Sequence, residues 1–272
     1  MRAVDRAYPK ERRSGLRAYA RVTVGGVPTA CLSRSQLAHL MAGDCLAARS
    51  DSRPPRLVFS ANGHSIAMAA LDRAFHNRLV GADLIHADGK PVVFASRLLT
   101  RTPVPERSAT TDFLFDAAAV AEAQGLKFFL LGSTDEINAR CAAALHARHP
   151  NLEIVGRHHG YFGADEEAAL CDEINRSGAD VLWVGMGIPL EYDFCLRNKA
   201  RLRPGWIVTC GGCFNFAAGD YVRAPAWMQA WGFEWLFRMW REPRRLFWRY
   251  LVTNPVAIAV LLLRTRSAAQ AA

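Results

Sequence analysis

The segment LKFFLL at Leu126–Leu131, followed directly by Gly132-Ser133-Thr134, decides the fold class of this chain. The apolar run predicts a buried strand, the Gly-Ser-Thr run predicts a turn and a helix N-cap, and Asp135–His149 continues as a helix. A strand that passes through a short turn into a helix is the repeating unit of a parallel α/β sheet. We therefore expect a sheet covered by helices.

The same unit recurs on both sides of this segment, and no dinucleotide-binding fingerprint accompanies it. Such repeats bring the strand-to-helix turns to one edge of the sheet, where ligands bind. The predicted fold is α/β, a Rossmann-like sheet with helices on both faces. The predicted strands are Arg56–Ser60, Leu84–His86, Leu152–Val155, Val181–Val184 and Trp206–Thr209, and the predicted helices are Ser65–Ala74, Glu166–Arg176 and Glu191–Leu202.

We expect three parts along the chain. Residues 1–53 form a basic N-terminal segment and a small β/α cap, with one strand pattern at Arg21–Thr29 and one helix pattern at Ser33–Ala48. Residues 54–219 form the Rossmann-like core. Residues 220–272 form a helical appendage rich in tryptophan and arginine.

The appendage carries its tryptophans at helical spacing. Trp227, Trp231 and Trp235 recur every four residues and predict one shared helix face, whereas Pro243 must start a new helix or kink the old one. Leu251–Leu263 is apolar but interrupted at Thr253-Asn254-Pro255 and falls short of the ~20 residues that span a bilayer. Tryptophans beside arginines suit a bilayer headgroup region. The alternative is a helix that packs its tryptophans on the core and leaves a solvated basic face.

The composition indicates a folded protein with an anionic partner. With 272 residues and 51% apolar content the chain is not disordered, and its net charge of +9 fits nucleic acid, a phosphorylated substrate or an acidic membrane. The seven cysteines lack zinc-site spacing and are expected to be reduced thiols. Met1–Arg21 is basic without the apolar core of a signal peptide, so we expect the protein in the cytoplasm.

Several turn residues are candidates for binding and chemistry. A glycine after a strand lets the backbone come close to a phosphate group. Each of these glycines can equally be explained as part of a tight turn that binds no ligand. Asp88 lies between a strand end and Gly89, where a carboxylate can act as a general base or simply form an Asp-Gly turn. No acidic pair is spaced for a metal on phosphates, so arginines are expected to neutralise a phosphate leaving group. The candidate glycines are Gly132, Gly185, Gly187 and Gly212.

Blocks of sequence across roughly Val22 to Pro255 resemble the WecG/TagA/CpsF family, glycosyltransferase family twenty-six, in the family's order. They are RLVFSANGHSIAMA (56–69), ADLIHADG (82–89), PERSATTD (105–112), FFLLG (128–132), IVGRHHGYF (154–162), VGMGIP (184–189), CGGCFNFAAG (210–219) and the Trp/Arg-rich run 223–250. The resemblance implies an inverting, metal-independent transferase without a cofactor. It would move a hexose or N-acetylhexosamine from a UDP-sugar to a polyprenyl-diphosphate-linked sugar in bacterial cell-surface or exopolysaccharide assembly.

The resemblance also implies roles for single residues. Asp88 matches the family's proposed general base, and the appendage is expected to bind the anionic inner leaflet of the cell membrane, making the protein peripheral. Homo-oligomers are a further expectation, and nucleic acid is not an expected partner. The remaining matched residues, expected to bind substrate, are Ser60, Asn62, Arg107, Arg238, Arg245 and Arg249, the last less securely because Trp248 stands where an arginine is common.

The chain departs from the family pattern at several positions. Glu191 replaces a neutral amide, and Asn215 stands where aspartate is frequent. An acidic side chain at a sugar pocket would favour hydroxyls over a hexuronate, which is the reason to expect a neutral donor sugar. A basic membrane- or nucleic-acid-binding module without transferase activity is the alternative function. An NAD-dependent oxidoreductase is disfavoured because its glycine fingerprint is absent.

Overall fold

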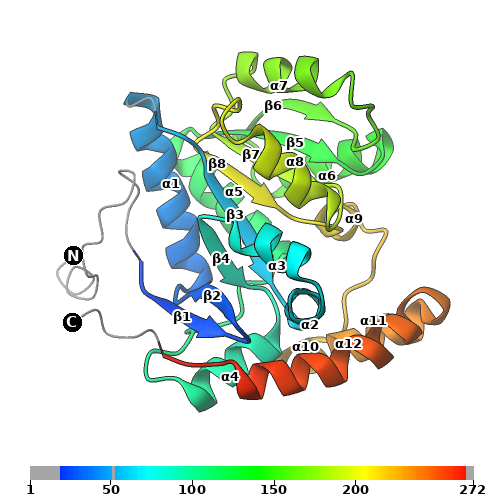
Figure 1. Ribbon diagram of the computed structural model, residues 1–272. Coiled ribbons are helices and arrows are strands. Elements are labelled where there is room, and N and C mark those ends of the chain that lie inside the picture. Colours follow the sequence, from blue (N-terminus) through cyan, green and yellow to red (C-terminus); the bar gives the residue numbers. More distant parts are fainter. Residues whose placement is uncertain (1–18, 51–52, 268–272) are drawn as a thin grey trace, which may run out of the picture.

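The computed structural model describes residues 19–50 and 53–267, apart from the side chain of Arg245. The basic segment before residue 19 lies outside this range. A six-stranded parallel sheet in the order β4-β3-β8-β7-β5-β6 forms the centre of the molecule (Figure 1). The predicted Rossmann-like architecture is confirmed. The strands are β3 (Arg56–Ala61), β4 (Leu84–Ala87), β5 (Lys127–Gly132), β6 (Glu153–His158), β7 (Val181–Gly185) and β8 (Trp206–Thr209).

Helices cover both faces of the sheet because side chains alternate sides along each strand. On one face Phe59 stacks on Tyr192 of α8, with ring centroids 4.4 Å apart. On the other face Trp183 packs against Phe113 and Phe128. The first face is covered by α2 (Gly63–Leu71), α3 (Arg73–Val80), α7 (Glu167–Arg176) and α8 (Leu190–Asn198), and the second by α1 (Arg34–Ser50), α5 (Thr110–Gln124), α6 (Asp135–Arg148) and α9 (Cys213–Ala217).

The N-terminal part differs from the prediction. The expected single strand at Arg21–Thr29 is a hairpin of β1 (Arg21–Val24) and β2 (Val27–Ala30), because Gly25 and Gly26 adopt positive φ and turn the chain. The predicted helix at Ser65–Ala74 is likewise two helices, since Asp72 is extended, ends α2 and caps α3. Helices α4 (Lys90–Leu99) and α5 were not predicted.

The C-terminal helices also correct one prediction. Gly232 adopts a left-handed conformation (φ 80°) that ends α10, so Trp235 lies on the next helix and does not share a face with Trp227 and Trp231. Pro243 starts a new helix, as predicted. These helices are α10 (Ala226–Trp231), α11 (Glu234–Arg241) and α12 (Pro243–Leu263).

Helix α12 is continuous and packs back onto the core. Pro255 remains inside it, and among the described residues one segment, Leu246–Leu263, is long and apolar enough to cross a membrane by length and composition. Its inner side packs along α2, where Leu261 joins the core, and Arg266 beyond it pairs with Thr23 of β1 (Figure 1). The appendage thus lies against the edge of the sheet where β3 and β4 end.

Candidate active site

Asp88 follows β4 at the carboxyl edge of the sheet, and its side chain is held without being sealed in the core. One carboxylate oxygen accepts a hydrogen bond from the Thr110 backbone N–H at 3.0 Å, and the other accepts from the Asn62 amide at 3.4 Å. The residue is half-buried. Gly89 has φ −98°, so no left-handed turn explains the Asp-Gly pair. The carboxylate is therefore positioned and accessible, as a general base requires.

Asn62 is oriented by the helix that it caps. Its side-chain oxygen accepts from the Ser65 N–H at 3.0 Å, and its own N–H donates to the Ser65 hydroxyl at 2.9 Å, which together form a capping box. Because the amide oxygen is used by α2, the amide nitrogen points toward Asp88. Ser60 is half-buried near the end of β3 and pairs in register with His86.

Arg107 connects Asp88 to the C-terminal helices. Its Nε donates to the Asp88 carbonyl at 2.6 Å, and its guanidinium contacts the Glu234 carboxylate at 2.7 Å. The two charged side chains are only 16% and 17% exposed. Glu234 was not predicted from the sequence, yet it brings the first turn of α11 to the catalytic edge.

Two histidines at this edge of the sheet, His86 and His64, have lowered pKa values. Burial lowers the pKa of His86, which shares a hydrogen bond with the Ser108 hydroxyl at 3.0 Å. Burial, and then the charge of Arg249, lower the pKa of His64 to about 4. The effect of Arg249 on His64 places this arginine of α12 beside the first turn of α2.

The predicted glycine turns lie together beyond β5, β7 and β8. Gly132 and Gly185 are buried against each other, and a Cβ on Gly132 would lie 2.3 Å from the Gly185 carbonyl oxygen. Close approach of two strands thus explains these glycines. Gly187 has φ 79° and open space around its Cα, whereas Gly212 is exposed. These last two remain candidates for contact with a ligand.

Glu191 is placed differently from the expectation that it meets a sugar. The residue is 3% exposed, and one carboxylate oxygen accepts backbone hydrogen bonds from Gly187 and Gly211, each at 3.0 Å. Burial raises its pKa to about 7. The Glu191 carboxylate accepts hydrogen bonds from the backbone of the turn after β7 and of the turn after β8, and so it connects the two turns. In this structure it is used by the backbone and not by a sugar pocket.

The arginines of the appendage are spread along its helices. The Arg238 guanidinium lies over the Phe216 ring, 5.5 Å from its centroid. Arg249 is exposed on α12. Arg245 also belongs to α12, but its side chain is outside the described part of the structure. The structure therefore gathers Ser60, Asn62, Asp88 and Arg107 at one point, with Arg249 nearby and Arg238 farther along α11.

Metal-binding and disulfide chemistry are not evident in the described residues. All seven cysteines are free and buried. Within residues 19–50 and 53–267, no three His, Cys, Asp or Glu side chains gather as a metal site would require.

Comparison with known proteins identifies the family of this chain. Residues 22–271 match the model of the glycosyl transferase WecG/TagA/CpsF family. The chain is 30% identical over 207 residues, 75% of its length and 78% of the relative's, to the N-acetylglucosaminyldiphosphoundecaprenol N-acetyl-beta-D-mannosaminyltransferase of Bacillus subtilis (strain 168). It is 28% identical over 192 residues to the protein of the same name from Staphylococcus aureus (strain MRSA252), covering 70% of this chain and 74% of that protein. The chain belongs to the WecG/TagA/CpsF family of glycosyltransferases.

Proposed function

We propose that this protein is an inverting glycosyltransferase that moves a hexose or N-acetylhexosamine from a UDP-sugar to a polyprenyl-diphosphate-linked sugar. The observation that carries the proposal is the carboxylate of the half-buried Asp88, held by Asn62 and Thr110 beside the guanidinium of Arg107. Inversion at an anomeric carbon needs one base to take the proton of the attacking hydroxyl, and one carboxylate suffices.

In the proposed reaction, a hydroxyl of the acceptor sugar attacks the anomeric carbon of the donor while Asp88 accepts its proton. The bond from the anomeric carbon to the UDP oxygen breaks, and UDP leaves with that electron pair. Arg107 donates to the Asp88 carbonyl and would neutralise the leaving diphosphate. Its contact with Glu234 must then be exchanged for one with phosphate.

The names of the relatives support the choice of substrates. Both are named as transferring an N-acetylmannosaminyl group to a diphosphoundecaprenol-linked N-acetylglucosamine. A polyprenyl-linked acceptor would place the protein at the cytoplasmic face of the cell membrane, in the assembly of a cell-surface polymer. The neutral donor sugar rests on these names, because Glu191 is bonded to backbone here.

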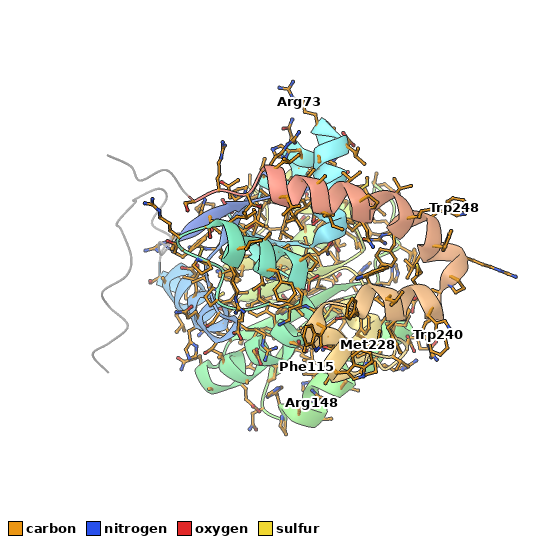
Figure 2. The ribbon with its side chains drawn as sticks, turned by 90° about the horizontal axis from the view of Figure 1, so that it is seen from below. Arg73, Phe115, Arg148, Met228, Trp240 and Trp248 are labelled. Atoms are coloured by element: carbon orange, nitrogen blue, oxygen red, sulfur yellow. The ribbon has the colours of Figure 1, made fainter. Side chains whose placement is uncertain are left out.

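Attachment to that membrane is supported by the exposed surface of the C-terminal helices. Trp227, Trp231, Trp240 and Trp248 are each more than 60% exposed. Figure 2 shows Trp240 and Trp248 at the outer edge of the corner between α11 and α12. Exposed tryptophans beside arginines are typical of helices that lie in a bilayer interface. We propose peripheral binding to an anionic inner leaflet.

Replacing the carboxylate of Asp88 tests the proposed chemistry. Asp88→Asn keeps the size of the side chain and should lower the rate of UDP release about 10²–10⁴-fold, the usual contribution of a general base. The assay offers a panel of UDP-sugars with a short-chain prenyl-diphosphate sugar and detects UDP and product by mass. Asp172→Asn, an exposed change on α7, is the control and should retain full rate. A near-normal rate in the Asp88 variant would refute the role of this carboxylate.

A further inference from the structure

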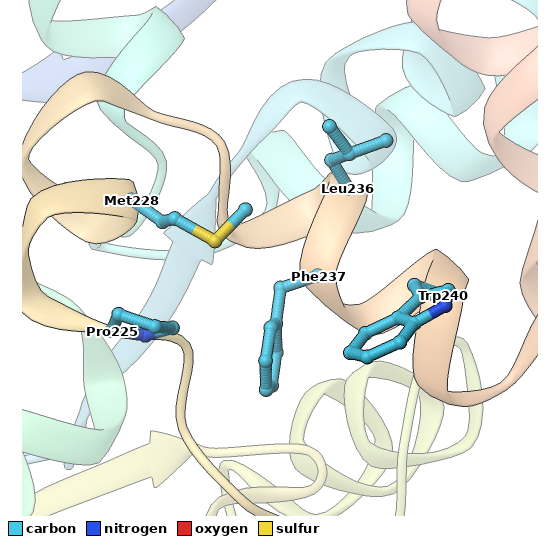
Figure 3. Close-up of a pocket in the computed structure, with 5 residues that line it drawn as sticks. All are labelled: Pro225, Met228, Leu236, Phe237 and Trp240. Atoms are coloured by element: carbon cyan, nitrogen blue, oxygen red, sulfur yellow. The ribbon is translucent and has the colours of Figure 1, made fainter.

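Two hollows lie side by side on α11 and share one wall. The first, between α10 and α11, measures about 350 Å³ and is lined only by apolar side chains. Figure 3 shows them around its opening: Pro225, Met228, Leu236, Phe237 and Trp240. The second measures about 230 Å³, and Phe237 belongs to both. A ligand on this surface could therefore contact both hollows at once.

The second hollow is polar and contains two guanidiniums. Arg238 and Arg241 line it together with Phe216 and Tyr221, and the carboxylates Asp220 and Glu242 are also present. Asp220 is engaged by Arg140 at 2.6 Å, which leaves the pair of arginines facing one further carboxylate. Guanidiniums bind the oxygens of phosphates through paired hydrogen bonds. This hollow fits an anionic group that carries more than one phosphate oxygen.

The apolar hollow is exposed in the isolated chain. Trp240 is 76% exposed and Leu236 is 40% exposed. Apolar surface of this kind is left open where a ligand or partner covers it. The apolar hollow borders the arginine-lined hollow at Phe237, so a ligand that fits both is an apolar chain ending in an anionic head.

Helix α11 connects both hollows to the edge of the sheet at Asp88. Glu234 at the start of the helix contacts Arg107 and so lies beside Asp88. Arg238 follows one turn later, and Trp240 and Arg241 stand at the end, about 10 Å from Glu234 at 1.5 Å per residue. A ligand whose sugar lies near Asp88 could therefore place its diphosphate and its hydrocarbon chain in the two hollows beside the same helix.

We propose that the apolar hollow binds the first isoprene units of a prenyl diphosphate whose diphosphate lies against Arg238 and Arg241. The inference rests on the proposed function, because it assigns the lipid end of the acceptor. It gives Trp240 and Leu236 a role in recognising the acceptor that is separate from contact with a bilayer. The bound chain covers apolar surface, so affinity must grow with the number of isoprene units.

The test uses the full chain without membranes and below the concentration at which the ligands aggregate. Inorganic diphosphate, dimethylallyl diphosphate and farnesyl diphosphate are titrated by calorimetry. We expect farnesyl diphosphate to bind at least tenfold more tightly than dimethylallyl diphosphate. Trp240→Ala and Leu236→Ser should each remove most of that difference, and Arg241→Gln should weaken all three ligands by a similar factor.

Trp227→Ala is the matched control, since Trp227 is 62% exposed on α10 but does not line the hollow. This variant should keep the chain-length preference while reducing attachment to anionic vesicles. Equal affinity for the two prenyl diphosphates, or an equal loss in the Trp227 variant, would overturn the inference. Transfer assays separate it from the proposed function. Sugar transfer without chain-length preference refutes only the hollow, whereas tight farnesyl binding without transfer to any acceptor refutes only the transferase.

Discussion

The buried carboxyl of Glu191 makes the stability of the protein depend on pH in a defined direction. The pKa of this group is about 7 in the folded protein, against an ordinary value of 4.5, because burial penalises its charged form. Below pH 4.5 the carboxyl is protonated in both the folded and the unfolded chain. Between pH 4.5 and 7 the unfolded chain loses the proton first. Stability therefore falls as pH rises through this window and is constant above it.

The size of the effect follows from the two pKa values. Between pH 5 and pH 8 this single group should lower the free energy of unfolding by about 2.5 kcal/mol, since one pH unit corresponds to about 1.4 kcal/mol. Glu191→Gln removes the titration and retains an oxygen that can accept from Gly187 and Gly211. The buried amide nitrogen adds a cost of about 1–3 kcal/mol that does not depend on pH.

The assay is urea unfolding of the wild-type protein and the Glu191→Gln variant at pH 5, 6, 7 and 8. The stability of the variant relative to wild type should rise by about 2.5 kcal/mol across the series, whatever the offset at pH 5. Comparing the two proteins cancels the titration of every other group. Glu173→Gln, on the exposed side of α7, should show no such trend. A difference for Glu191→Gln that stays constant within about 0.5 kcal/mol would refute the argument from burial.

The remaining predictions concern a glycine and an ion pair. Gly132→Ala should prevent folding or remove most of the stability, because its Cβ would lie 2.3 Å from the Gly185 carbonyl oxygen. Gly178→Ala, at a left-handed position (φ 68°) with nothing within 4 Å, should cost only about 1–2 kcal/mol in urea unfolding. Comparable losses in the two variants would contradict the close approach of β5 and β7. Glu234→Gln should strengthen UDP binding several-fold in calorimetry, since it removes the carboxylate that occupies Arg107. Unchanged affinity would show that Arg107 does not meet the diphosphate.

The sheet was predictable from the sequence because its strands are continuous apolar runs. The predicted strand Trp206–Thr209 is found with the same bounds, and Arg56–Ser60 is extended by a single residue. The strands of a parallel sheet must be continuous apolar runs when helices cover both faces of the sheet, because the side chains on both sides of each strand are then buried. Two of the errors fall where the conformation of a glycine decides the path of the chain. Gly25-Gly26 makes a hairpin of one expected strand, and Gly232 separates tryptophans whose spacing alone predicted a common face.

The candidate site was predictable only in part, because some of its contacts join distant segments. Asp88, Asn62 and Arg107 belong to short motifs, and the structure brings them together. Glu234 and Arg107 are 127 positions apart in the sequence, so no local sequence pattern predicts their ion pair. Glu191 could be recognised as a departure from the family, but its two backbone partners depend on how the turns after β7 and β8 meet.

The hydrogen bonds of Asp88 explain how one carboxylate can be fixed and still reactive. Each carboxylate oxygen has two acceptor sites, and the Thr110 N–H and the Asn62 amide use one site on each oxygen. One site on either oxygen is left for the hydroxyl of an acceptor. Arg107 does not compete for these sites, because it donates to the Asp88 carbonyl and not to the carboxylate. In the proposed reaction its charge would meet the leaving diphosphate once its contact with Glu234 is exchanged for one with phosphate.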